Sequence, residues 1–213
     1  LMEKDTTQGI IKKSIVEFPG ESISSILKKT IETLENTIGV FYIYNKNKKL
    51  IYVDYSKDIK NKVVKLFTSK KFIPKYVQNN FKSIKTHKTG NVEIAILKAI
   101  QEIKSLSPKI NNNIDPKLFY KIETPLVIVN KKDFIITLSG KKDDEKGFIL
   151  FKDGKIEGYG YFDLFNNINT EKKLNSRVVK VNECKKVKNY VYRLISEKRY
   201  KKLLTLKEIY KFS

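Results

Sequence analysis

The sequence contains very little cysteine, arginine and histidine, and no tryptophan. Its 213 residues include one cysteine, Cys184, and one histidine, and only three of its 44 basic residues are arginine. A single cysteine excludes an intramolecular disulfide framework and a zinc site built from several cysteines. No apolar run approaches the ~18 residues of a membrane span, and the first residues are polar, without a secretory leader. We therefore expect a cytoplasmic protein with no membrane partner.

Acidic residues are scarce relative to basic ones. The chain has 44 Lys plus Arg against 23 Asp plus Glu, which gives a formal net charge of +21. Such an excess favours a polyanionic partner, and nucleic acid, in the first place DNA, is the leading candidate. The alternative is that the charge serves solubility or reflects a coding bias towards lysine. Such a bias should enrich Asp and Glu as well, so it explains the excess of lysine over arginine but not over acidic residues.

The positive charge is concentrated in two stretches. No acidic residue lies between Ile59 and Val92, where nine lysines occur, and residues 172–213 hold 14 basic residues against three glutamates. The chain is also 40% hydrophobic, with 12 Tyr and 12 Phe, which argues against general disorder. The two stretches are therefore expected to form charged faces of a folded protein.

Apolar periodicity in the first half predicts a β-hairpin, a helix, a third strand and a long helix. Residues 39–44 and 49–54 are rich in β-branched and aromatic side chains, and a polar turn separates them. Residues 58–67 repeat apolar side chains with helical spacing, residues 81–89 resemble a strand, and residues 91–106 carry the apolar stripe of a longer helix.

Three consecutive asparagines at residues 111–113 mark a boundary, after which short apolar runs dominate. Asp153-Gly154 is a two-residue hairpin signal, and residues 187–195 have the spacing of a basic amphipathic helix. We therefore predict an α+β chain in three parts. These are a lead-in strand and helix over residues 1–34, a compact unit over residues 35–112, and a smaller α+β region with a basic helix over residues 113–213.

Short motifs in the first half resemble those of a nuclease family. Gly39-Val40-Phe41 begins the first predicted strand, Tyr52-Val53-Asp54 lies in the second, and residues 56–63 open the following helix. Their order and spacing resemble the GIY-YIG nuclease superfamily, most closely its excision-repair UvrC and Cho-like type. That type includes copies fused to DNA polymerase III epsilon-like exonucleases in Bacteroidetes-type bacteria. Residues 107–111 resemble the segment that closes the domain, and residues 147–163 resemble the region that follows it. The resemblance implies a three-stranded antiparallel sheet flanked by helices.

The resemblance also implies a catalytic machinery, of which this chain keeps little. In the family, two tyrosines flank the scissile phosphate, a helix arginine stabilises the developing charge, and a glutamate on a later helix holds a divalent metal ion. Here Phe41 replaces the first tyrosine, Tyr52 keeps the second, and Lys62 replaces the arginine without its planar fork. Asp54 replaces a glycine, and Ala99 stands where the metal-binding glutamate is expected.

The missing glutamate determines whether a metal ion can be expected at this site. Without that carboxylate we expect no cofactor. If cleavage survives, Asp54 or Glu102 would have to serve as a relocated ligand for Mg²⁺ or Mn²⁺, with Tyr52 and Lys62 as remnant catalytic positions. The alternative for Asp54 is that a carboxylate is merely tolerated at this position once catalysis is lost.

Three functions remain open at this point. The first is a nucleic-acid-binding protein on a degenerate GIY-YIG scaffold that has lost most or all cleavage. The second is an active metal-dependent endonuclease of DNA repair with a relocated ligand, and the third is an interaction module for an exonuclease or repair protein. We expect the first, a binding protein rather than an enzyme, because lysines persist on and near the phosphate-facing helix. They are Lys57, Lys60, Lys62, Lys65, Lys70 and Lys71.

Overall fold

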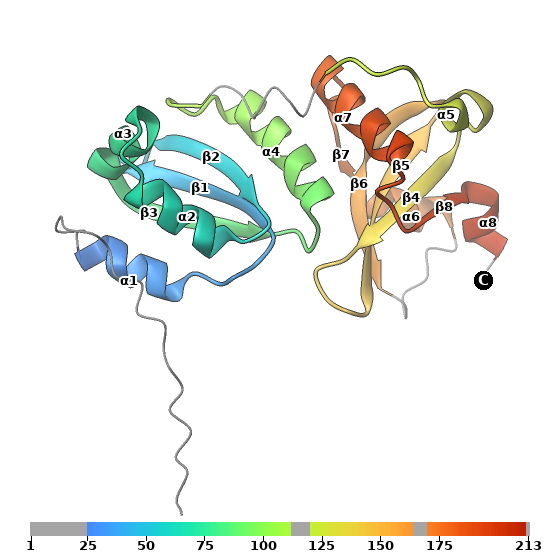
Figure 1. The fold of residues 1–213 in the computed structure, drawn as a ribbon. Coiled ribbons are helices and arrows are strands. Elements are labelled where there is room, and N and C mark those ends of the chain that lie inside the picture. Colours follow the sequence, from blue (N-terminus) through green and yellow to red (C-terminus); the bar gives the residue numbers. More distant parts are fainter. Residues whose placement is uncertain (1–24, 112–119, 164–169, 212–213) are drawn as a thin grey trace, which may run out of the picture.

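The computed structural model describes residues 25–111, 120–163 and 170–211. In these residues two antiparallel sheets are flanked by helices, and a long helix lies between them (Figure 1). The lead-in strand expected within residues 1–34 falls outside the described part of the chain, as does the expected boundary at residue 113. The limits of the three predicted parts therefore stay predictions.

The first sheet is the predicted hairpin with one further strand. Its members are β1 (Gly39–Asn45), β2 (Leu50–Ser56) and β3 (Phe81–Lys88), in the order β2-β1-β3. Both pairings of β1 are antiparallel. Asn45 closes the hairpin, because its side-chain oxygen accepts hydrogen bonds from the backbone N–H groups two and four residues later, at 3.0 and 2.9 Å. The predicted α+β class and three-stranded antiparallel sheet are confirmed.

Three helices pack on one face of this sheet: α1 (Ser25–Thr33), α2 (Ile59–Thr68) and α3 (Phe72–Asn80). Asp58 caps α2, since its carboxylate accepts a hydrogen bond from the backbone N–H of Asn61 at 3.0 Å. The apolar side chains between helices and sheet form one buried cluster: Leu27, Ile31, Phe41, Ile43, Ile51, Ile59, Val63, Phe67, Val77 and Phe81. This cluster holds α2, which carries Lys62, against β1 and β2.

The other face of the sheet packs against α4 (Val92–Leu106), the predicted long helix. Asn91 caps this helix, because its side-chain oxygen accepts a hydrogen bond from the backbone N–H of Ile94 at 2.8 Å. Eight residues of the helix are buried: Glu93, Ile94, Ala95, Ile96, Leu97, Ala99, Ile100 and Ile103. Burial on so many sides requires neighbours other than the first sheet.

The second sheet supplies those neighbours. Its strands are β4 (Phe134–Ser139), β5 (Glu145–Lys152), β6 (Lys155–Asp163), β7 (Val179–Lys180) and β8 (Lys202–Thr205). They follow the order β7-β6-β5-β4-β8. The predicted two-residue turn joins β5 to β6, with φ values of 49° at Asp153 and 71° at Gly154. Positive φ at both positions is what a tight type I′ hairpin turn requires, so this prediction is confirmed.

The predicted basic helix of the second half is α7 (Lys185–Ser196), whose apolar side chains are buried. Three shorter helices complete this half: α5 (Leu126–Asn130), α6 (Glu171–Ser176) and α8 (Leu206–Lys211). Across the described ranges, no helix has both the length and the apolar character needed to cross a bilayer.

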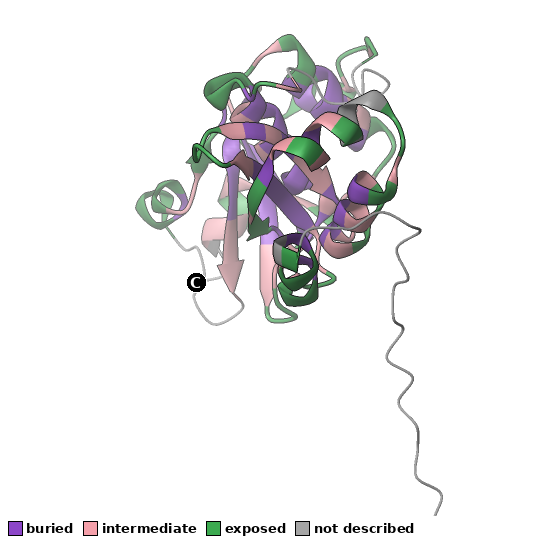
Figure 2. Ribbon diagram, turned by 90° about the vertical axis from the view of Figure 1, so that its left-hand side faces the viewer, coloured by how far each residue is buried: buried purple, intermediate pink, exposed green. Residues whose placement is uncertain are grey.

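One buried cluster joins the two sheets through α4. It contains Val40 and Val53 from the first sheet, Ile136 and Ile149 from the second, and Tyr190 from α7, together with the buried face of α4. Figure 2 shows buried residues running through the interior of the molecule, while exposed residues lie on its outer helices and turns. The described residues therefore share a core that extends across both sheets.

A buried carboxylate also links the halves at the start of α4. Glu93 is 7% exposed. It accepts hydrogen bonds from Arg199 Nη1 at 2.9 and 3.0 Å and from the Tyr190 hydroxyl. Burial, reinforced by the neighbouring Glu93, raises the pKa of Tyr190 well above its usual range, so this hydroxyl stays a donor.

Replacing Glu93 by alanine tests this link. Tyr190, which is fully buried, would lose this acceptor, and Arg199 would lose one of its two carboxylate partners. We therefore expect the free energy of unfolding to fall by ~2–3 kcal/mol. Urea denaturation measures the change. The exposed Glu123 forms no ion pair within the described residues, and Glu123→Ala should cost less than ~0.5 kcal/mol. Equal, small losses for both variants would contradict the anchoring role of Glu93.

Candidate nucleic-acid interface and degenerate nuclease site

Tyr52, Asp54 and Lys62 converge on one face of the first sheet. Tyr52 and Asp54 are two residues apart on β2, so their side chains share a face, and Lys62 comes from α2 on that face. Asp54 Oδ2 accepts a hydrogen bond from the Tyr52 hydroxyl at 2.9 Å and lies 2.8 Å from Lys62 Nζ. Its Oδ1 accepts a hydrogen bond from the backbone N–H of Tyr55 at 2.8 Å. The carboxylate therefore ties Tyr52 and Lys62 together.

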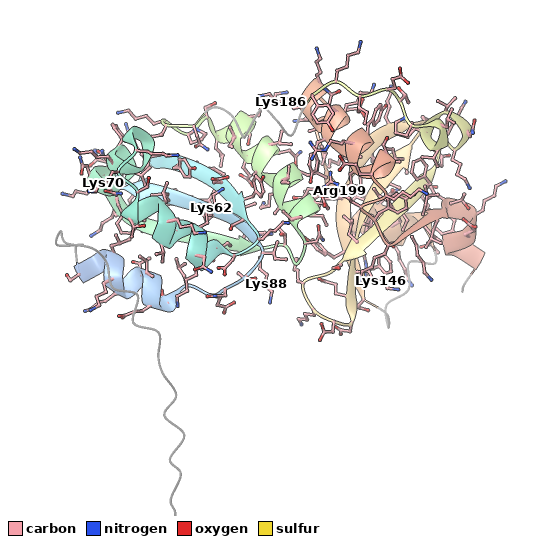
Figure 3. All side chains as sticks on the ribbon, in the orientation of Figure 1. Lys62, Lys70, Lys88, Lys146, Lys186 and Arg199 are labelled. Carbon is pink, nitrogen blue, oxygen red and sulfur yellow. The ribbon has the colours of Figure 1, made fainter. Side chains whose placement is uncertain are left out.

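The members of this cluster differ in their access to solvent. The side chain of Asp54 is 14% exposed, whereas that of Lys62 is 43% exposed. Lys62 also donates to the backbone carbonyl of Tyr55 at 3.3 Å and lies over its ring, 5.3 Å from the centroid. Figure 3 labels Lys62 on α2. The ammonium group can thus meet a ligand from solvent while it holds the buried carboxylate.

The Tyr52 hydroxyl acts as a donor. Burial, followed by the negative charge and the hydrogen bond of Asp54, raises the pKa of Tyr52 well above its usual range. Near neutral pH this phenol stays protonated and does not provide a phenolate base. Phe41, directly opposite Asp54 in the β1–β2 register, is fully buried, and its ring centroid lies 6.1 Å from that of Tyr52. Having no hydroxyl, Phe41 contributes packing alone.

Ala99 and Glu102 lie on the opposite side of the sheet. Ala99 is fully buried in the core shared by the two sheets. Glu102, on the same helix, forms an ion pair with Lys98 at 2.8 Å. Burial, and then the proximity of Glu102, raise the pKa of Tyr42, which faces α4. The structure therefore brings Tyr52, Asp54 and Lys62 together, and it does not bring Ala99 or Glu102 to them.

The residues present do not form the metal site that the family resemblance implies. Ala99 offers no ligand atom, and both oxygens of Asp54 already accept from Tyr52, Lys62 or Tyr55. Within the described parts of the chain, no three His, Cys, Asp or Glu side chains lie close enough together to hold a metal ion. Asp54 and Glu102 face opposite sides of the sheet, so they cannot share an ion.

Five of the six predicted phosphate-binding lysines form what we call the α2–α3 lysine surface: Lys57, Lys60, Lys65, Lys70 and Lys71. Four of them are exposed and Lys60 is half-buried. None forms an ion pair with a carboxylate of the described residues. The sixth, Lys62, is paired with Asp54. Helical spacing places Lys62 and Lys65 on one flank of α2 and Lys60 on the other. These lysines therefore form a cationic face around α2 that lacks ion-pair partners among the described residues.

Asn111 is a positioning residue that we did not single out from the sequence. Its side chain spans the outer edge of β2, where Oδ1 accepts from the Val53 N–H at 3.0 Å and Nδ2 donates to the Val53 carbonyl. Val53 lies between Tyr52 and Asp54, so Asn111 holds the strand that carries both. The resemblance of residues 107–111 to the closing segment of the family domain was the available signal.

The first sheet, its helices and the positions of Tyr52 and Lys62 resemble the GIY-YIG unit that the motifs predict. Comparison with known proteins shows which members of this superfamily the chain is similar to. Over 178 residues the chain is 27% identical to the UvrABC system protein C of Borreliella burgdorferi strain ZS7, an alignment that covers 79% of this chain and 26% of that protein. The corresponding protein of Borrelia garinii subsp. bavariensis is 24% identical over 170 residues, with the same coverage of 79% and 26%. The predicted resemblance to the UvrC type is therefore confirmed.

The extent of the similarity is limited. No family model matches the chain. The chain spans about a quarter of the length of the curated relatives it matches, 26%. The magnesium-bound GIY-YIG N-terminal endonuclease domain of UvrC from Thermotoga maritima aligns over 98% of its length with 41% of this chain, at 20% identity and a TM-score of 0.39. A point mutant of that domain gives 22% identity and the same TM-score of 0.39.

Ala99→Glu tests whether the position of the family ligand is closed. A carboxylate forced into this fully buried site would be unpaired, and we expect the free energy of unfolding to fall by more than ~4 kcal/mol. Urea denaturation measures the loss. Ser105→Glu places the same side chain at an exposed position of the same helix and should cost less than ~1 kcal/mol. A well-folded Ala99→Glu protein that binds Mg²⁺ in a calorimetric titration would show that the site is open.

Proposed function

We propose that the chain binds DNA through the α2–α3 lysine surface and cleaves it poorly or not at all. The observation that carries the proposal is that the cationic face around α2 has no carboxylate partners in the described residues, while the remnant catalytic pair beside it is tied to Asp54. The face is free to bind phosphates, and the adjacent site lacks the groups needed to break a phosphodiester.

The lysines determine the kind of binding. Lysine presents a compact point charge that contacts backbone phosphates without reading base edges. Five such contacts would give a slope of log affinity against log salt of about −4 to −5. Affinity should therefore depend steeply on salt and weakly on sequence.

Three features support impaired cleavage. Ala99 supplies no metal ligand, Phe41 has no hydroxyl, and the raised pKa of Tyr52 keeps its hydroxyl protonated. Lys62 replaces an arginine and has its charge partly neutralised by Asp54. Similarity to the UvrABC system protein C supports a role in DNA repair, in which an exonuclease or a repair protein would be a further partner.

Paired lysine variants test the binding face. Wild-type affinity for a fluorescent duplex, measured by anisotropy over a salt series, should fall steeply as salt rises. Lys65→Ala with Lys70→Ala should flatten the slope by about 2, because each contact contributes about 0.9. Lys201→Ala with Lys207→Ala removes the same charge beside β8 and α8, far from α2 in Figure 1, and should change the slope by less than ~0.5.

Two outcomes would contradict the proposal. Equal effects of the two pairs would mean that binding follows net charge and has no particular face. Absence of duplex binding at physiological salt would favour the interaction module instead.

A nicking assay tests the loss of cleavage. With Mg²⁺ or Mn²⁺, we expect supercoiled plasmid to stay intact at protein concentrations that saturate binding, because the family's metal ligand position holds Ala99. Tyr52→Phe serves as the control. Nicking by the wild-type chain that disappears in Tyr52→Phe would establish an active endonuclease and overturn the proposal that cleavage is impaired.

A further inference from the structure

Three hydrogen-bond donors from two elements converge on the carboxylate of Asp54. The Tyr52 hydroxyl and Lys62 Nζ reach Oδ2 at 2.9 and 2.8 Å, and the Tyr55 N–H reaches Oδ1 at 2.8 Å. A phenol, an ammonium and a backbone amide are also donors that bind phosphate oxygens in proteins. The donors around Asp54 are thus arranged like an anion-binding site, and the anion that they bind is the carboxylate of Asp54 itself.

The surroundings of this site connect it to the lysine surface. The side chain of Lys62 is 43% exposed, so it is accessible from solvent. Lys65 lies about one turn further along the same flank of α2 and is exposed without an ion pair in the described residues. A phosphodiester backbone lying on Lys65 would pass close to Lys62 and would meet the negative charge of Asp54 there.

We propose that Asp54 is a built-in anion that occupies the Tyr52–Lys62 pair in place of a nucleic-acid phosphate and so limits the affinity of this surface. The inference rests on the proposed DNA binding and names the residue that regulates it. Asp54 acts in two ways, because it neutralises Lys62 and repels an approaching phosphate. Without the carboxylate, Tyr52 and Lys62 could donate hydrogen bonds to the phosphates of the nucleic-acid backbone.

Removal of the carboxylate charge should raise affinity. Asp54→Asn keeps the shape of the side chain and loses the charge, which adds about one phosphate contact through Lys62. One added contact steepens the salt slope by about 0.9 and raises affinity about fivefold to tenfold near 0.1 M salt. The gain should be independent of sequence, because phosphate contacts carry no base information.

Glu102→Gln is the matched control. Asp54 and Glu102 each form an ion pair with a lysine at 2.8 Å, so each variant removes one negative charge and releases one ammonium group. Glu102 lies on the α4 side of the sheet, away from Tyr52 and the lysine surface. Anisotropy with the same duplex should show affinity within about twofold of wild type for Glu102→Gln.

A double variant identifies the donor. If the gain comes through the released ammonium, Asp54→Asn combined with Lys62→Met should return the salt slope to that of the wild type. Persistence of the whole gain in the double variant would overturn the role of Lys62. Asp54→Gly provides a second route should the asparagine variant fold poorly, and thermal unfolding checks both proteins before binding is measured.

The outcomes separate this inference from the proposed function. In one outcome, the affinity of the wild type for duplex falls steeply as salt rises, but Asp54→Asn binds no more tightly than Glu102→Gln. This result would refute the role of Asp54 as a built-in anion and leave the binding proposal standing. Failure of both the wild type and Asp54→Asn to bind duplex would refute the two together. A selective gain in Asp54→Asn that Lys62→Met removes establishes the inference.

Discussion

The burial of α4 between two sheets is the constraint on which the rest of the structure depends. The first sheet contributes Val40 and Val53 to the core that buries the helix, and the second sheet contributes Ile136 and Ile149 to the same core. At its start, Glu93 binds Arg199 and Tyr190. A helix packed in this way leaves little room for polar side chains, because an unpaired charge in such a core is costly. The composition of α4 is therefore set by the partner on each side.

This packing determines where chemistry can occur. The position at which the family resemblance places a metal-binding glutamate falls on the fully buried Ala99. The small apolar side chain of Ala99 therefore both removes the ligand and fills a place in the shared core. Glu102, on the same helix, is partly exposed and pairs with Lys98. The remaining polar cluster, around Asp54, lies on the other face of the sheet, where α2 covers it.

Local elements were largely predictable, whereas contacts between them were not. The hairpin, α2 and α4 follow from side-chain periodicity, and Asn91 caps α4 within a few residues of the chain. The sequence suggested Ser56 as the cap of α2, whereas the structure gives that role to Asp58. The bond between Glu93 and Arg199 joins positions 106 residues apart, and no local pattern encodes it. The same limit applied to Asp54. The family resemblance implied that Asp54 stands at a glycine position, but only the packing of α2 on β2 shows that Tyr52 and Lys62 both hold this carboxylate.

The distribution of ion pairs explains the composition of the cationic face around α2. Within the described residues, the ion pairs engage seven carboxylates. Two of the three arginines take part: Arg193 pairs with Glu197, and Arg199 pairs with both Glu197 and Glu93. The planar fork of arginine is thereby used inside the structure, where it can satisfy carboxylates from two directions. The face around α2 is left with lysine alone. Lysine neutralises phosphates as a compact point charge but lacks the planar fork of arginine. A face of this composition can be strong in low salt, but it cannot be selective by itself.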